Sequence, residues 1–282
     1  MKYSIVEINK IVNGKFLQER EDIVITHVCI DTRQITNAAG CLFFCLVARN
    51  DGHQHIEKAY KKGIRNFIIS KEIETNTFTD ASFVLVENTT VALQQLAKYH
   101  REQFNIPVIG ITGSNGKTIV KEWLYQLLAS EMKVVKSPKS YNSQVGVPLS
   151  ILGINENHNL GIFEAGISQA GEMDQLEKII KPTIGIFTNI GETHNEGFLN
   201  MRHKINEKLN LFKNSSVLIY GKDYHELHDC ILQFSTQLKN NIDREIQLLN
   251  WSRKGEADLL ITSIVKGGQQ STIKGIYKGE EC

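Results

Sequence analysis

One segment combines glycines with a lysine and a threonine, Gly110-Ile-Thr-Gly-Ser-Asn-Gly-Lys-Thr118. It follows a strand-like run, Val108–Thr112, and leads into residues 118–130, whose apolar residues recur at helical spacing. Glycines let backbone N–H groups approach phosphate oxygens, and the start of the helix adds a positive field. Lys117 is expected to reach the β- and γ-phosphates of a nucleotide, and the Thr118 hydroxyl to bind magnesium. We therefore predict a nucleotide-binding loop.

A carboxylate stands at the end of a second apolar run, Leu160-Gly-Ile-Phe-Glu164. Open α/β sheets bind their ligands at the carboxyl ends of the strands, which makes Glu164 a candidate metal ligand. A carboxylate in such a strand is costly to bury unless a cation balances its charge. A solvent-exposed strand end is the alternative.

Further segments follow the loop in a fixed order: Tyr141-Asn-Ser-Gln-Val-Gly-Val-Pro148, Phe163-Glu-Ala-Gly166, Thr188-Asn-Ile-Gly-Glu-Thr-His194 with Glu196-Gly-Phe198, and Lys208-Leu-Asn-Leu-Phe212. Together with the loop they resemble the motifs of the Mur ligases, ATP-dependent enzymes that assemble the peptide of the peptidoglycan precursor. Asp31-Thr-Arg33 and Asp51-Gly-His53 are similar to elements of the UDP-sugar-binding domain in that family. Asn142–Pro148 and His194-Asn-Glu-Gly-Phe198 look most like the segments of the member that adds D-alanyl-D-alanine.

The resemblance implies three groups of site residues. ATP would be bound by Thr112, Gly113, Ser114, Asn115, Gly116, Lys117, Thr118 and Asn189. Two magnesium ions would be held by Thr118, Glu164, His194 and a carbamylated Lys208. The UDP-linked substrate would contact Thr32, Arg33, Asn142 and Ser143. Lys117, His194 and Lys208 would be the catalytic residues, although a surface position for His194 and a solvent-exposed helix face over Lys204–Lys208 remain open.

The implied reaction joins a carboxylate to an amine. ATP would phosphorylate the terminal carboxylate of UDP-N-acetylmuramoyl-tripeptide, and the amine of D-alanyl-D-alanine would displace phosphate from the acyl phosphate. Four alternatives remain: another, amino-acid-adding Mur ligase, a folylpolyglutamate synthase-like ligase, a small-molecule kinase, and a module that binds nucleotide and UDP-peptide without turnover. The folate-type alternative is disfavoured because about 105 residues precede the loop.

Short β-branched runs alternate with helical periods, which predicts a mainly parallel sheet covered on both faces. We expect an α/β protein with a small N-terminal UDP-substrate-binding domain, residues 1–105, and a doubly wound P-loop ATPase domain, residues 106–282. The expected strands are 23–30, 41–48, 66–70, 82–86, 108–112, 133–136, 160–165, 184–189, 217–220, 246–250 and 259–264. The expected helices are 54–62, 89–104, 118–130, 171–180 and 200–213.

Composition limits the remaining options. The 282 residues carry a formal net charge of +1, which gives no bulk attraction to nucleic acid. No apolar run approaches the roughly 20 residues that span a bilayer, and the N-terminus becomes polar too early for a signal peptide. We expect a cytoplasmic monomer that lacks the family's third, C-terminal domain and is inactive alone.

Cysteines and tryptophans give weaker signals. We interpret Cys41 and Cys45 as two buried thiols on one strand face, and Trp123 and Trp251 as core residues.

Overall fold

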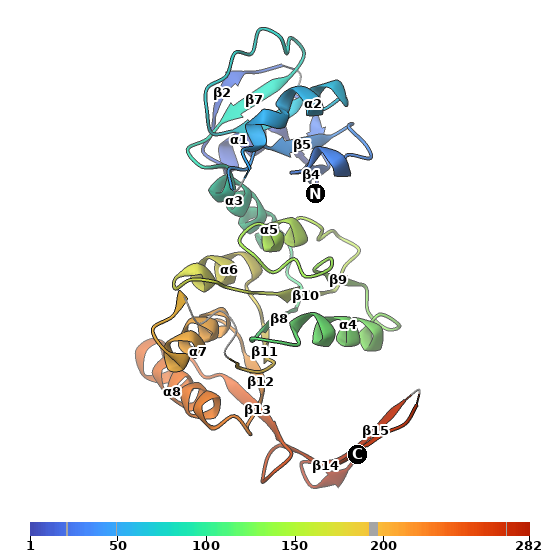
Figure 1. Ribbon diagram of the computed structural model, residues 1–282, viewed down its shortest axis with the longest axis vertical. Helices are drawn as coiled ribbons and strands as arrows, with labels where there is room; N and C mark the ends of the chain where they lie inside the picture. The colour runs from blue at the N-terminus through green and yellow to red at the C-terminus, as the bar shows by residue number, and fades with distance from the viewer. Residues whose placement is uncertain (21, 49, 192–196, 269) are drawn as a thin grey trace. The chain divides into compact units, whose positions relative to one another are not determined.

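The computed structural model describes residues 1–20, 22–48, 50–191, 197–268 and 270–282 (Figure 1). These residues form two compact units. The first unit contains Met1–Asn105 and Gln144–Asn157, and the second contains Ile106–Ser143 and His158–Cys282. Gln144–Asn157, which the sequence analysis assigned to the second domain, thus packs with the N-terminal residues.

The first unit is built on a sheet of mixed direction. Its strands lie in the order β2 (Lys15–Gln18), β7 (Ser82–Leu85), β6 (Asn66–Ile69), β5 (Cys41–Phe44) and β4 (His27–Cys29). All neighbouring strands are parallel except β2 and β7. A separate short ladder pairs β1 (Tyr3–Ser4) with β3 (Val24–Ile25). The helices of this unit are α1 (Ile5–Ile11), α2 (Ile56–Lys61), α3 (Thr89–Glu102) and α5 (Gly146–Ile151).

Aromatic residues from neighbouring strands fill the core of the first unit. The rings of Phe67 and Phe83 stack with their centroids 4.8 Å apart, and Phe43 meets Phe67 edge to face. Cys41 and Cys45, which directly follows β5, both belong to this buried cluster, so the two thiols lie on the same side as predicted. Both thiols are free.

Helix α3 buries a histidine in the first unit. His100 Nδ1 lies 2.8 Å from the Tyr3 hydroxyl, and His100 Nε2 lies 2.9 Å from the Ile154 carbonyl oxygen. Because a carbonyl oxygen can only accept, Nε2 carries the proton and Nδ1 accepts from the hydroxyl. Burial lowers the pKa of His100 to about 4, so the neutral ring is the stable form at neutral pH.

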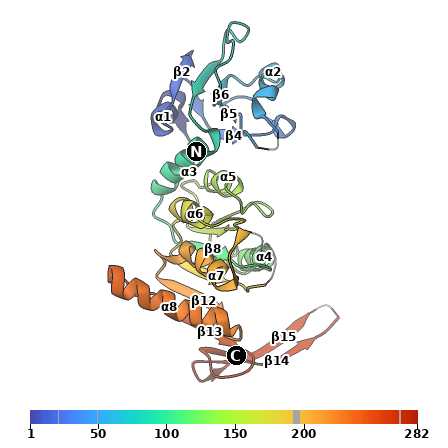
Figure 2. The ribbon, with the colours of Figure 1, turned by 60° about the vertical axis from the view of Figure 1, so that its left-hand side comes forward.

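The second unit is organised around a long, mainly parallel sheet. Its order is β9 (Val134–Lys136), β10 (Leu160–Glu164), β8 (Val108–Thr112), β11 (Ile184–Phe187), β12 (Val217–Gly221), β13 (Gln247–Ser252), β14 (Leu259–Lys266), β15 (Ser271–Tyr277) and β16 (Glu280–Glu281). Neighbouring strands are parallel from β9 to β14, and the pairings of β15 are antiparallel. Strands β14 and β15 form a hairpin that extends away from the helices of this unit (Figure 2).

Helices cover both faces of the parallel strands. Helix α4 (Lys117–Leu128) lies on one side, and α6 (Glu172–Ile180), α7 (Met201–Leu209) and α8 (His225–Ile242) lie on the other (Figure 1). On the α4 side, Val120, Leu124 and Leu128 pack against strand residues such as Ile111 and Ile162. The predicted doubly wound α/β arrangement is confirmed.

Several elements differ from their sequence-based expectation. The run 23–30 divides between β3 and β4, which belong to different sheets, and the expected helix over 200–213 ends at Leu209, before a 3-10 turn over Asn210–Phe212. The prediction missed α1, although Ser4 and Glu7 form a capping box at its start.

Trp123 is the clearest error of the core prediction. Its exposed fraction is 63%, and it points outward from α4 with Ile119 and Leu127. Helix α4 has apolar residues on more than one face, and only the face with Val120 and Leu124 meets the sheet. Trp251 is half-buried, against Gly221.

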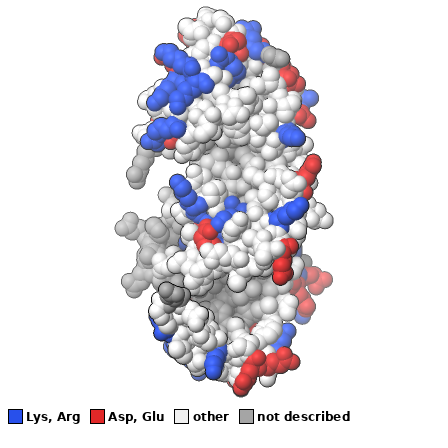
Figure 3. Space-filling model, turned by 90° about the vertical axis from the view of Figure 1, so that its right-hand side faces the viewer, with Lys and Arg blue, Asp and Glu red and all other residues white. Residues whose placement is uncertain are grey.

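On the face drawn in Figure 3, each unit presents basic as well as acidic side chains. Among the described residues, no helix has both the length and the apolar character needed to cross a membrane.

Candidate functional site

The glycine-rich loop connects the buried end of β8 to the first turn of α4. Gly113 and Gly116 adopt φ values of +140° and +82°, which favour glycine. A Cβ atom on Gly113 would lie 2.1 Å from the Thr188 hydroxyl oxygen, so the position has no room for a side chain. Helix α4 begins directly after Gly116, at Lys117. The predicted order of strand, glycine loop and helix is present.

Residues after β11 hold this loop from the side. The Ser114 amide donates to the Asn189 carbonyl oxygen over 2.9 Å, and the Asn115 amide donates to Asn189 Oδ1 over 3.0 Å. The Thr188 hydroxyl donates to the Asn115 carbonyl oxygen over 2.7 Å. Asn189 therefore braces the loop in this structure, which sequence reasoning had not anticipated.

Lys117 folds back over the loop. Its ammonium donates to the Gly113 carbonyl oxygen over 2.8 Å. Burial lowers its pKa, and the charge of Glu164 partly offsets that effect. Phosphate oxygens would offer this ammonium charged acceptors in place of a carbonyl.

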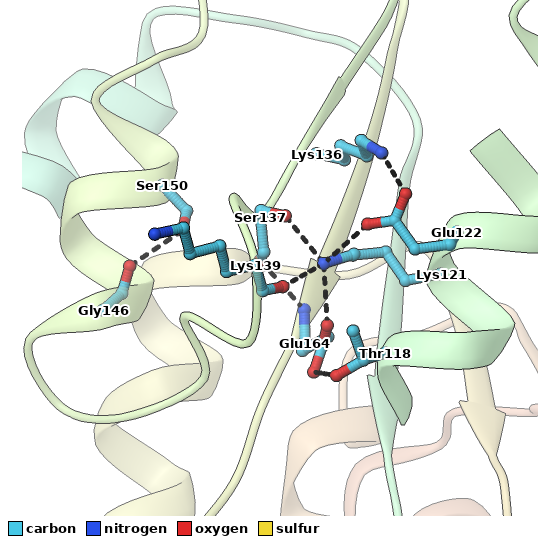
Figure 4. A network of polar contacts seen from close by, with 9 residues as sticks. All are labelled: Thr118, Lys121, Glu122, Lys136, Ser137, Lys139, Gly146, Ser150 and Glu164. Carbon is cyan, nitrogen blue, oxygen red and sulfur yellow. Dashed lines mark hydrogen bonds and ion pairs between the residues drawn. The ribbon is translucent and has the colours of Figure 1, made fainter. Parts of the chain in front are cut away.

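Glu164 is fully buried beside the start of α4 (Figure 4). The Thr118 hydroxyl donates to its Oε2 over 3.0 Å, and Lys121 Nζ lies 2.9 Å from its Oε1 in an ion pair. The Lys121 ammonium thus balances the charge of this buried carboxylate. The alternative of a solvent-exposed strand end is therefore wrong, because Glu164 ends a strand covered on both faces.

Lys121 is a site residue that sequence reasoning missed. Its side chain is completely buried and donates to the carbonyl oxygens of Ser137, over 2.8 Å, and Lys139 (Figure 4). An ion pair to Glu122 adds a second carboxylate at 3.2 Å. Its one sequence signal is its position four residues after Lys117, on the same side of α4.

Two further lysines extend from α7, Lys208 toward the glycine loop and Lys204 toward Gly191 after β11. Lys204 and Lys208 are 1% and 3% exposed, so the alternative of a solvent-exposed helix face is wrong. Lys204 Nζ donates to the Gly191 carbonyl oxygen over 2.6 Å, and Lys208 Nζ lies 3.5 Å from the Gly113 carbonyl oxygen. Burial, with repulsion from Lys117 and then Lys204, lowers the pKa of Lys208 to about 7.

The other predicted residues fall into three places. His194 lies outside the described residues. Asn142 accepts a 2.8 Å hydrogen bond from the Gly166 amide through its carbonyl oxygen, so it lies beside the end of β10, and Ser143 follows it. Thr32 and Arg33 belong to the first unit, where Thr32 is buried and Arg33 is exposed and paired with Asp31 at 2.7 Å.

Comparisons with known proteins identify the family to which the chain belongs. A family model described as the Mur ligase middle domain matches residues 111–273. The UDP-N-acetylmuramoyl-tripeptide–D-alanyl-D-alanine ligase of Bacillus subtilis is 32% identical over 285 residues, which cover 98% of this chain and 58% of that protein. The chain thus spans less than two thirds of the length of this curated relative.

Solved structures share the fold. A crystal structure of MurF from Acinetobacter baumannii matches with a TM-score of 0.84 and 22% identity, over 100% of this chain and 60% of that one. MurF from Thermotoga maritima in complex with ADP matches with a TM-score of 0.74 and 23% identity, over 91% and 57%. With its phosphate loop inside the matched middle domain, the chain belongs to the Mur ligase family.

Proposed function

We propose that this chain acts in an ATP-dependent ligase that adds D-alanyl-D-alanine to UDP-N-acetylmuramoyl-tripeptide. The supporting observation is that the ammonium groups of Lys117 and Lys208 both lie near the Gly113 carbonyl oxygen, next to the buried pair of Thr118 and Glu164. The name of the Bacillus subtilis relative supports this substrate pair. We also propose that the reaction takes place in the cytoplasm, because its substrates are ATP and a UDP-linked peptide.

The residues of the loop have separate tasks in this proposal. The backbone amides from Gly116 to Thr118, at the start of α4, would hold the phosphates of ATP, and the Lys117 ammonium would contact the β- and γ-phosphates. Phosphorylation of the substrate carboxylate gathers negative charge at the transferred group, and fixed buried cations stabilise such charge most effectively. Lys204, whose ammonium donates to the Gly191 carbonyl oxygen, would contribute to this field from the side of α7.

The donor atoms at the end of β10 fit magnesium. Glu164 offers a buried carboxylate that is paired with Lys121 through Oε1, and the Thr118 hydroxyl lies 3.0 Å from its Oε2. Hard cations prefer such oxygen donors. When bound, magnesium would neutralise charge on the phosphates. We propose Thr118 and Glu164 for one ion, with His194 contributing to a second.

Lys208 would join the magnesium ligands only after carbamylation. An ammonium repels a cation, whereas a carbamate offers oxygen donors. Carbon dioxide reacts with a neutral amine, and the lowered pKa of Lys208, about 7, leaves a large neutral fraction at physiological pH. Burial next to Lys117 and Lys204 therefore supports this modification.

The UDP-linked substrate would be bound in part by the first unit. Arg33 presents an exposed guanidinium of the kind that pairs with phosphate, and Thr32 stands next to it. Asn142 and Ser143, near the end of β10, would contact the peptide part.

The acceptor assignment is tested with the natural protein that contains this chain. Phosphate release from ATP would be measured with UDP-N-acetylmuramoyl-tripeptide and, in parallel, D-alanyl-D-alanine, single amino acids or no acceptor. The proposal predicts release and a pentapeptide product with the dipeptide alone. Turnover with a single amino acid would assign the chain to an amino-acid-adding ligase, and ATP binding without turnover would support the binding module.

A further inference from the structure

Three side chains with soft or borderline donor atoms meet at the edge of the sheet in the first unit. His27 and Cys29 lie on the edge strand β4, and Cys41 lies on the neighbouring strand β5. The strands are parallel with His27 opposite Cys41, so all three side chains leave the same face. A ring nitrogen of His27 and the two sulfur atoms lie within 4.8 Å of one another.

This donor set suits a zinc-class cation. Tetrahedral zinc binds thiolate at about 2.3 Å and imidazole at about 2.0–2.1 Å, which separates its ligand atoms by roughly 3.5–3.8 Å. The observed limit of 4.8 Å exceeds that separation by about 1 Å, which side-chain rotation can supply. Two sulfur donors and one imidazole favour zinc over magnesium or calcium, which require oxygen ligands.

The surroundings of His27 prepare the ring for metal binding. Its Nε2 lies 3.0 Å from the Asn37 carbonyl oxygen, which can only accept, so the proton is on Nε2 and Nδ1 keeps a lone pair. A backbone carbonyl that holds the second nitrogen is the usual partner of a metal-binding histidine. Nδ1 accepts from the Thr26 hydroxyl at 3.0 Å, and that hydroxyl has a second acceptor, the Gly40 carbonyl oxygen, at 3.4 Å.

The two thiols are not equivalent. Cys41 is fully buried, whereas His27 and Cys29 are half-buried at the sheet edge. A cation can therefore enter from the side of β4, and solvent can fill its fourth position.

We propose that His27, Cys29 and Cys41 form a binding site for one zinc-class divalent cation. The bound ion would join β4 to β5 through side chains as well as through the backbone ladder. Strand β4 ends two residues before Asp31, whose carboxylate caps the turn over Thr32–Gln34, so the ion would also hold the start of that turn.

The test uses cobalt(II) as a spectroscopic probe on the full chain under a phosphine reductant, without nucleotide. We expect one equivalent of cobalt to give an ultraviolet sulfur-to-cobalt charge-transfer band, which oxygen sites such as Glu164 cannot produce. Zinc should displace the cobalt and abolish the band. No band with the unaltered chain would overturn the proposal.

Variants identify the ligands. Cys29→Ser and His27→Gln, both at half-buried positions, should weaken cobalt binding by about tenfold or more, while Cys282→Ser, at an exposed cysteine, should leave it unchanged. Circular dichroism would establish that each variant is folded. If Cys41→Ser also folds, its cobalt binding would be measured in the same way. Retention of the full band in both Cys29→Ser and His27→Gln, or its loss in Cys282→Ser, would contradict the assignment.

Discussion

Two fully buried lysines flank the same phosphate loop in opposite electrostatic situations. Lys121, on α4, lies 2.9 Å from Glu164 and donates to the carbonyl oxygen of Ser137. Lys208, on α7, has a 3.5 Å contact with the Gly113 carbonyl oxygen, and its described neighbours include the ammonium groups of Lys117 and Lys204. Lys121 is a compensated charge within the structure, whereas Lys208 is an amine whose charge is unfavourable.

This contrast separates structural from functional use of the same residue type. A buried ion pair does not need a ligand to balance its charges, because the two charges neutralise each other. A buried amine without a carboxylate partner gains a favourable partner when phosphate or carbon dioxide arrives. We therefore assign Lys121 to the integrity of the site and Lys208 to its chemistry.

The largest expected effect belongs to Lys121→Met. This change leaves Glu164 buried and charged, which should cost about 3–5 kcal/mol in the free energy of unfolding. The double variant with Glu164→Leu should recover much of that loss. Urea denaturation measures both values, and a single variant as stable as the unaltered chain would remove the structural role of Lys121.

Lys117→Ala tests the lysine that lies on the loop itself. Loss of a charged hydrogen bond to phosphate is worth about 1.5–3 kcal/mol, so ATP affinity should fall roughly 10- to 100-fold. Titration with a fluorescent ATP analogue measures this affinity. Lys178→Ala, at an exposed position of α6, is the matched control. Equal affinity of both variants would argue against the phosphate-loop assignment.

His100 is a third buried ionisable residue, and both nitrogens of its neutral ring have hydrogen-bond partners. Its pKa in the folded state, about 4, lies below the ordinary value of 6.5, so between these pH values the unfolded chain binds more protons. The first unit should therefore lose stability as pH falls from 6.5 to 4, by up to about 3 kcal/mol. His100→Gln should flatten this dependence, while His225→Gln, at an exposed position, should retain it.

The smallest expected change in stability follows Lys208→Met. Among the described residues no carboxylate forms an ion pair with Lys208. Replacing its amine by an apolar side chain of similar length should therefore alter the unfolding free energy by less than about 1 kcal/mol, or raise it. Ligase activity of the natural protein should nevertheless fall strongly. A stability loss as large as that of Lys121→Met would mean that the two lysines have the same role.

Local patterns were sufficient to predict the loop and much of the fold. Gly113, Gly116 and Lys117 lie next to one another in sequence, and the alternation of strands and helices indicates a parallel sheet without long-range information. The division of residues 23–30 into two strands depends instead on distant partners. Strand β3 pairs with Tyr3–Ser4, whereas β4 pairs with β5. Strand pairing between distant segments is not encoded in periodicity.

Burial of charged residues could not be predicted from the sequence. Lys121 and Lys204 have the spacing of exposed helix residues, and they are buried because strands and loops from elsewhere in the chain cover them. The exposure of Trp123 has the converse origin, since only one of the apolar faces of α4 meets the sheet. The approach of Cys29 to Cys41 likewise arises from strand pairing.

The difference between Lys121 and Lys208 is tested most directly by 13C NMR with labelled bicarbonate, ATP and magnesium. An amine without a carboxylate partner should give one carbamate signal that disappears in Lys208→Met and persists in Lys139→Met, a control at an exposed lysine. Persistence of the signal in Lys208→Met, or no carbamate signal from the unaltered protein, would contradict the assignment of Lys208 to the chemistry of the site.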